Sequence, residues 1–177
     1  MNLKATILQE HSKAQCNKIV IWVGHNQQRF DALIQLVLQN EPVISQRASW
    51  PMSYCTEAYP KLLQSNLPAI IPFLETPGLH NAIRRNTVRA LQVMPIPQQQ
   101  HGAVMNLCFN FLMDPQEAVA VKACSLTVLG NLTTLYPDII PEIKYCIAEL
   151  LPTQMASIKS RVKQLQKQWR QMEKQKP

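Results

Sequence analysis

Glycine is scarce in this sequence, with four residues in 177, and long hydrophobic runs are missing. There is no sustained apolar–polar alternation and no Asn-Gly or Asp-Gly turn, which argues against β-sheet structure. The longest apolar run is far shorter than the roughly 20 residues of a membrane span. The N-terminus also lacks the apolar core of a signal peptide. We therefore expect a soluble, cytoplasmic protein without a membrane span.

Motifs for catalysis, metal binding and phosphate binding are also missing. The five cysteines are odd in number and widely spaced, without a Cys-x-x-Cys pair, which favours free buried thiols in a reducing compartment. The four histidines are scattered, and no glycine-rich phosphate loop or Gly-x-Ser-x-Gly segment occurs. The acids form no pair that suggests acid–base chemistry. We predict no metal, no cofactor and no catalytic residue, and hence a protein that is not an enzyme.

A repeat of 37 to 40 residues runs through the chain. Basic residues recur at intervals of 38, 37 and 37, at Arg47, Arg85, Lys122 and Lys159. Prolines that precede apolar segments recur at intervals of 37 and 40, at Pro60, Pro97 and Pro137. Two independent markers with one period indicate a repeat architecture.

Between the markers, apolar residues have the spacing of amphipathic helices, as in Phe30, Leu33, Ile34, Val37 and Leu38. We predict first helices near 26–39, 61–75, 98–113 and 138–151, and second helices near 41–59, 79–94, 116–135 and 153–172. One or two further helices cover 3–24. The fold class is all-α, a right-handed α-α superhelix (a solenoid) of about four helix pairs. We expect one domain over 1–177, with N-terminal helices in 1–25, repeats at 26–59, 60–94, 95–135 and 136–172, and a frayed basic tail at 173–177.

These repeats resemble HEAT repeats, with two helices per unit and a basic residue near the start of each second helix. A narrower resemblance, to a family of short bacterial HEAT-like proteins, lies in the segments 18–20, 29–30, 108–112, 118–123, 136–137 and 159–161. That resemblance implies an armadillo-like solenoid and carries over no established activity. Some of those proteins bear the label adenylosuccinate lyase. The present sequence does not support that activity, because it lacks the serine-rich signature loop and is much shorter than that enzyme.

The recurring basic residues Arg47, Arg85, Lys122 and Lys159 should form a column along the stack. They either line a positively charged concave surface or bond neighbouring carbonyls and acids, which would tie the repeats together. Arg84 and Arg89 raise the charge near Arg85, so this patch is a candidate site for an acidic partner.

Two aromatic residues, Trp50 and Tyr54, lie one turn apart and follow Arg47. They would either stack on a base or peptide in a groove, or pack in the core at a repeat junction.

The segment from Lys159 to the end carries seven basic residues against Glu173 alone, whereas residues 1–158 carry eleven basic and ten acidic ones. The last predicted helix has an apolar stripe, which is typical of a cap helix that docks on the last repeat. The stripe consists of Met155, Ile158, Val162, Leu165, Trp169 and Met172. The same segment would also suit nucleic acid, an anionic membrane surface or a short coiled coil.

The repeat architecture favours a non-catalytic scaffold that presents a concave helical surface to a protein or peptide. The alternative is nucleic-acid binding through a basic groove, as in HEAT-like DNA-repair glycosylases. The sequence is compatible with a monomer or a weak dimer.

Overall fold

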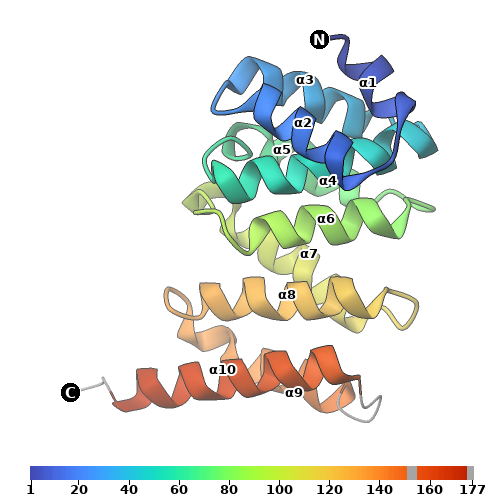
Figure 1. Cartoon of the computed structure of the whole chain (residues 1–177). Helices are drawn as coiled ribbons and strands as arrows, with labels where there is room; N and C mark the ends of the chain where they lie inside the picture. The colour runs from blue at the N-terminus through green and yellow to red at the C-terminus, as the bar shows by residue number, and fades with distance from the viewer. Residues whose placement is uncertain (151–154, 175–177) are drawn as a thin grey trace. The chain divides into compact units, whose positions relative to one another are not determined.

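In the computed structural model, which describes residues 1–150 and 155–174, every regular element is a helix and no strand occurs in those two ranges. The chain divides into two compact units, unit 1 over residues 1–100 and unit 2 over residues 101–177 (Figure 1). That the whole chain forms one domain stays a prediction.

Unit 1 contains six α-helices. They are α1 (Leu3–Gln9), α2 (Lys13–Val23), α3 (Gln27–Leu38), α4 (Pro42–Ala58), α5 (Leu67–Leu74) and α6 (Asn81–Leu91), with short 3-10 helices at Gln64–Asn66 (η1) and Gln98–Gln100 (η2). The helix α4 packs against α2, α3 and α6. In Figure 1, α2, α4 and α6 lie side by side in one layer, and α3 and α5 lie behind them.

Local signals fix the helix ends in unit 1. The Ser12 hydroxyl accepts a hydrogen bond from the backbone N–H of Gln15 at the start of α2, and Asn26 caps α3 in the same way. Gly24, with φ of 51°, ends α2 in the left-handed region that favours glycine. Pro42 occupies the first position of α4, where a missing N–H costs nothing.

The core of unit 1 is mainly apolar, and a buried hydrogen bond joins α4 to α6 within it. Phe30, Leu33 and Ile34 of α3 are fully buried, and so are Met52 of α4 and Ile70 of α5. The Asn86 amide donates a hydrogen bond of 2.9 Å to the Ser49 hydroxyl, and both residues are buried. These partners are 37 residues apart, so the period read from the sequence is the offset between α4 and α6.

Unit 2 contains four α-helices in its described part. They are α7 (His101–Met113), α8 (Val119–Leu132), α9 (Ile140–Leu150) and α10 (Ala156–Lys174), with a 3-10 turn at Pro137–Ile139 (η3). The helix α8 is apolar nearly all round and packs against both α7 and α10. A Cβ atom at Gly130 would lie 2.1 Å from Cδ2 of Leu165, so the absence of a side chain at Gly130 permits the close approach of α8 and α10.

The predicted helix pairs are confirmed, with shorter first helices than expected. Residues 61–66 form turns and a 3-10 segment instead of the first part of a helix, and α5 begins at Leu67. Pro68 lacks the backbone N–H that a helix continuing from Lys61 would need to bond the carbonyl of Gln64. In the first turn of α5 that N–H has no intrahelical partner, so α5 starts there. Pro141 has the same place in α9. Of the predicted tail 173–177, Glu173 and Lys174 belong to α10, and 175–177 lie outside the described residues, as do 151–154.

Candidate functional site

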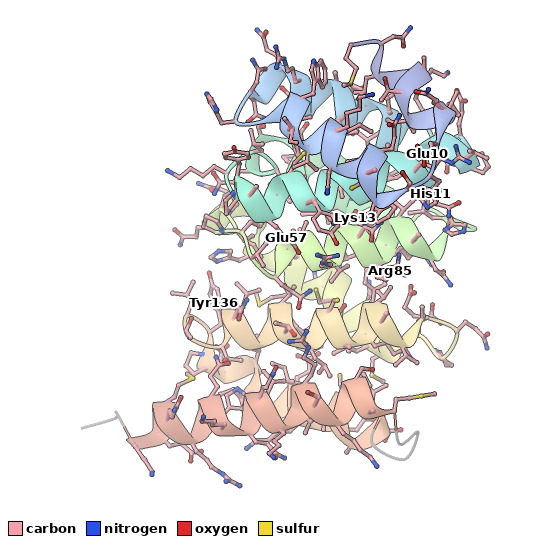
Figure 2. All side chains as sticks on the ribbon, viewed as in Figure 1. Glu10, His11, Lys13, Glu57, Arg85 and Tyr136 are labelled. Carbon is pink, nitrogen blue, oxygen red and sulfur yellow. The ribbon has the colours of Figure 1, made fainter. Side chains whose placement is uncertain are left out.

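A group of charged and aromatic side chains lies on the layer formed by α2, α4 and α6 in unit 1. We call it the basic–aromatic face, and it consists of Lys13 of α2, Trp50, Tyr54 and Glu57 of α4, and Arg85 and Arg89 of α6. Figure 2 shows Lys13, Glu57 and Arg85 on the side of unit 1 that carries these three helices. The face brings together Trp50, Tyr54, Arg85 and Arg89 from the residues predicted to bind.

Tyr54 lies at the centre of this face, between two cations from neighbouring helices. The Lys13 ammonium lies 3.3 Å from the centroid of the Tyr54 ring. The Arg89 guanidinium lies 4.7 Å from the same centroid. A cation over an aromatic ring is attracted by about 0.5–1 kcal/mol at an exposed site. The two contacts therefore tie α2 and α6 to α4 through one side chain.

The two arginines of α6 on this face differ in their contacts. Arg89 forms a salt bridge with Glu57 of α4, in addition to its contact with Tyr54. Arg85 is exposed, and its side chain has no hydrogen bond or ion pair with any residue in the part of the chain that the structure describes. A guanidinium in this state has all its donors open to water, and a carboxylate or phosphate would take them in pairs. Arg85 is the part of the face most available to a ligand.

Trp50 extends the aromatic surface toward the N-terminus. Its ring meets Tyr54 edge-on at 6.5 Å between centroids, and His11 edge-on at 5.1 Å. Trp50 and Tyr54 are half-buried, so each ring is held by its neighbours while part of it stays open to solvent. Neither of the two alternatives drawn from the sequence, core packing or full display in a groove, describes this arrangement alone.

The charges around Tyr54 change its acidity. Hydrogen bonds from Lys13 and, to a smaller extent, from Arg89 stabilise the phenolate of Tyr54. They lower the pKa of Tyr54 below 10.0. Burial alone would lower the pKa of Arg89, but its hydrogen bonds with Tyr54 and Glu57 outweigh burial and raise it. The face thus places three basic side chains and one acidic side chain around the phenol of Tyr54.

We predict that Tyr54 releases its proton at a lower pH than an ordinary tyrosine. The difference in near-ultraviolet tyrosinate absorbance between the wild type and Tyr54→Phe should rise with a midpoint below pH 10.0. Lys13→Ala should move that midpoint upward more than Arg89→Ala does, because the Lys13 hydrogen bond is the larger cause. Tyr145→Phe is the control, since Tyr145 is exposed. A Tyr54 midpoint at or above pH 10.0 would contradict the prediction.

Two residues of unit 1 that were predicted to bind a partner instead donate hydrogen bonds to backbone carbonyls. Arg47 donates to the carbonyl oxygens of Leu8 at 2.9 Å and Ile7 at 3.4 Å, at the end of α1. Arg84 donates to the carbonyl of Leu74 at 3.0 Å and to that of Thr76 at 3.1 Å, at the end of α5. Both contacts satisfy carbonyls that a helix end leaves without partners. These two arginines thus fit the structural alternative, in which basic residues tie elements together.

The remaining two residues that were predicted to bind a partner, Lys122 and Lys159, belong to unit 2. Lys122 of α8 is buried, at 8% exposure, and the described residues give its ammonium no hydrogen-bond partner. Lys159 lies at the start of α10 and is exposed. Neither is part of the basic–aromatic face.

Lys13, Glu57 and His11 were not predicted from the sequence. Lys13 and Tyr54 are 41 residues apart, close to one repeat, so a search for partners at that offset would have found the pair. Glu57 is one helical turn from Tyr54 on α4, but its partner Arg89 is 32 residues along the chain, short of one repeat, so the period does not indicate this pair. No marker in the sequence indicates His11, because the chain before α2 falls outside the repeat.

Three of the five thiols, those of Cys16, Cys55 and Cys108, are unsuited to nucleophilic chemistry. Burial raises the pKa of Cys16 to about 11 and the pKa values of Cys55 and Cys108 to about 12. Such thiols are protonated at neutral pH and are poor nucleophiles.

No group of three His, Cys, Asp or Glu side chains within 1–150 and 155–174 is arranged to hold a metal ion. In the same ranges, no helix has both the length and the apolar character that crossing a bilayer requires.

Comparison with known proteins identifies the repeat family. No curated protein and no solved structure matches the chain significantly. A family model described as HEAT repeat domain matches residues 3–169, which is nearly the whole chain. The matched range includes the described helices from α1 to α9 and most of α10. The chain therefore belongs to the HEAT repeat family.

Proposed function

We propose that the chain is a non-catalytic binding scaffold that holds a protein or peptide partner on the basic–aromatic face of unit 1. The observation that carries the proposal is the state of Trp50, Tyr54 and Arg85. Two aromatic rings are fixed by their neighbours and partly exposed, and the adjacent helix carries an arginine that has no hydrogen bond or ion pair among the described residues. Tryptophan, tyrosine and arginine are the residues that most often dominate binding energy at protein interfaces.

The fixed geometry of the rings lowers the cost of binding. A side chain that is ordered only on association loses about 0.5–1.5 kcal/mol of conformational freedom. Tyr54 is already held by Lys13 and Arg89, and Trp50 is held by His11 and Tyr54. The face can therefore meet a partner without first ordering its own aromatic anchors.

The charge of the face favours a partner segment with a carboxylate beside apolar residues. Lys13, Arg85 and Arg89 outnumber Glu57. A carboxylate of the partner would pair with Arg85, and apolar side chains next to it would cover the exposed parts of Trp50 and Tyr54.

The same face is less suited to base excision, the alternative drawn from the sequence. That chemistry needs a carboxylate directed at a flipped base. Glu57, the acid on this face, is bound to Arg89. The arrangement favours binding over acid–base chemistry.

The test compares two variants that each remove one tyrosine and one cation. Tyr54→Ala/Arg85→Ala changes the face, and Tyr145→Ala/Lys18→Ala removes exposed residues elsewhere. Partners would be captured by cross-linking in the source cells, purified, and titrated calorimetrically against each variant. We expect the face variant to bind roughly 10²-fold more weakly than the wild type, since two interface anchors are lost. The control should bind as the wild type does. Equal binding by both variants would contradict the proposal.

A further inference from the structure

The last helix, α10, has two separate stripes along its length. One is apolar and buried, with Ile158, Val162, Leu165 and Trp169. The other is basic and exposed, and we call it the basic stripe; it consists of Lys159, Lys163, Lys167, Arg170 and Lys174. Its residues are separated by steps of four, four, three and four. At 3.6 residues per turn these five positions fall within an arc of about 80°.

Within residues 1–150 and 155–174, no acid neutralises the basic stripe. None of its five side chains forms a salt bridge with an acid in the described parts of the chain, whereas in unit 1 Arg89 pairs with Glu57 and Lys4 pairs with Glu41. Glu173 is the one acid between Ala156 and Lys174. Like charges three or four residues apart on a helix repel by about 0.2–0.5 kcal/mol per pair. A bound polyanion would offset that repulsion, because each cation would be attracted to the negative charges of the polyanion.

The dimensions of the stripe fit an extended anion. Lys159 and Lys174 are fifteen steps apart along the helix, or about 22 Å at 1.5 Å per residue. One strand of a nucleic-acid duplex carries a phosphate every 3.4 Å or so along its axis, so several phosphates lie within that length. Near the end of the stripe, Lys167, Arg170, Gln171 and Lys174 line a shallow hollow of about 240 Å³. Its side chains are all hydrogen-bond donors, which phosphate oxygens accept.

The burial of the apolar stripe and the lack of exposed aromatic residues on α10 favour a nucleic acid over a membrane surface or an acidic protein. An amphipathic helix enters a membrane surface with its apolar face, but here that face is packed, with Leu165 against Gly130 and Trp169 against Thr133 of α8 and its C-terminus. A protein interface usually has large apolar or aromatic side chains at its centre, and no exposed residue between Ala156 and Lys174 is of that kind. A row of cations and glutamines without such a centre is suited to a sugar–phosphate backbone.

We propose that the basic stripe of α10 binds the phosphate backbone of a nucleic acid and does not read its base sequence. This activity belongs to unit 2 and is independent of the partner proposed for unit 1. All five cations contribute through charge and hydrogen bonds to phosphate oxygens. The affinity therefore depends strongly on salt and weakly on sequence.

The experiment measures fluorescence anisotropy of labelled nucleic acids with the full chain over a range of salt concentrations. With five phosphate contacts on a DNA duplex, the slope of log K against log salt should be about −4.5. Lys163→Gln/Lys167→Gln/Arg170→Gln should reduce the slope to about −1.8 and weaken binding roughly several-hundred-fold at about 0.1 M salt. These substitutions relieve repulsion within α10, so circular dichroism should show a folded variant.

The matched control is Lys4→Gln/Lys18→Gln/Lys61→Gln, which removes the same charge from exposed positions of unit 1. It should keep the slope and most of the affinity, and two unrelated duplex sequences should bind equally. Single-stranded DNA and RNA arms show which form binds best. The proposal is overturned by no binding at about 50 mM salt, or by equal losses in the two triple variants. Binding to phosphatidylserine vesicles or to polyglutamate as tight as to nucleic acid would overturn it as well.

Discussion

Replacing Trp169 with alanine is expected to lower the free energy of unfolding by about 3–5 kcal/mol. The Trp169 side chain is 5% exposed and packs α10 against the other helices of unit 2. Its indole N–H donates to the Thr133 hydroxyl at 3.4 Å, and the Lys144 ammonium lies 5.7 Å from its ring. Alanine would leave a cavity in place of the largest side chain of the apolar stripe and remove both contacts. Since small domains have about 5–15 kcal/mol of stability in total, this is a large fraction.

Urea denaturation followed by circular dichroism checks this expectation, because the helical signal does not depend on the removed tryptophan. Trp169→Phe should lose much less stability, since it keeps most of the apolar volume and gives up mainly one hydrogen bond. Met172→Ala, at a half-buried position one turn along, is the second control. A Trp169→Ala protein within about 1 kcal/mol of the wild type would show that the apolar stripe does not hold α10 in place.

Phe30→Ala in unit 1 is expected to cost about as much, roughly 3–5 kcal/mol. Phe30 is fully buried in α3, which packs on α4, the helix that carries Trp50, Tyr54 and Glu57. The cavity would lie beneath the basic–aromatic face. We therefore expect the midpoint of urea denaturation to fall and, in the folded fraction, the lowered pKa of Tyr54 to move back toward 10.0.

The control for Phe30→Ala is Phe109→Ala on α7, since Phe109 is a half-buried phenylalanine of the other unit. It should cost less, because part of its ring already contacts water. An unchanged Tyr54 midpoint in Phe30→Ala would show that the face holds its geometry without the layer beneath it. Equal destabilisation in the two variants would contradict the burial argument.

The helical architecture could be predicted from the sequence because its signals are local. The spacing of Phe30, Leu33, Ile34 and Val37 gives the buried side of α3, and all four residues are buried. The period also gives the offset seen between Ser49 and Asn86. The segment 61–66 was predicted wrongly, because its composition suits a helix while Pro68 starts a new one.

The basic–aromatic face could be predicted only in part, because it depends on how neighbouring helices align. Trp50, Tyr54 and Arg89 were found as residues of suitable type near a repeat marker. Lys13 and Glu57 become relevant only through their contacts with Tyr54 and Arg89 on other helices. Arg47 and Arg84 look like further binding residues in the sequence, and their bonds to the carbonyls of Leu8 and Leu74 depend on where α1 and α5 end.

The hydrogen bond between Asn86 and Ser49 has a mechanical consequence. Sliding α6 along α4 by one turn would separate the Asn86 amide from the Ser49 hydroxyl in a dry interior, at a cost of about 1–3 kcal/mol for the unpaired amide. The Ser49 hydroxyl would keep its hydrogen bond to the carbonyl of Gln46. Unit 1 is thus stiff toward shear of these two helices, although the apolar contacts around the pair would tolerate some slippage.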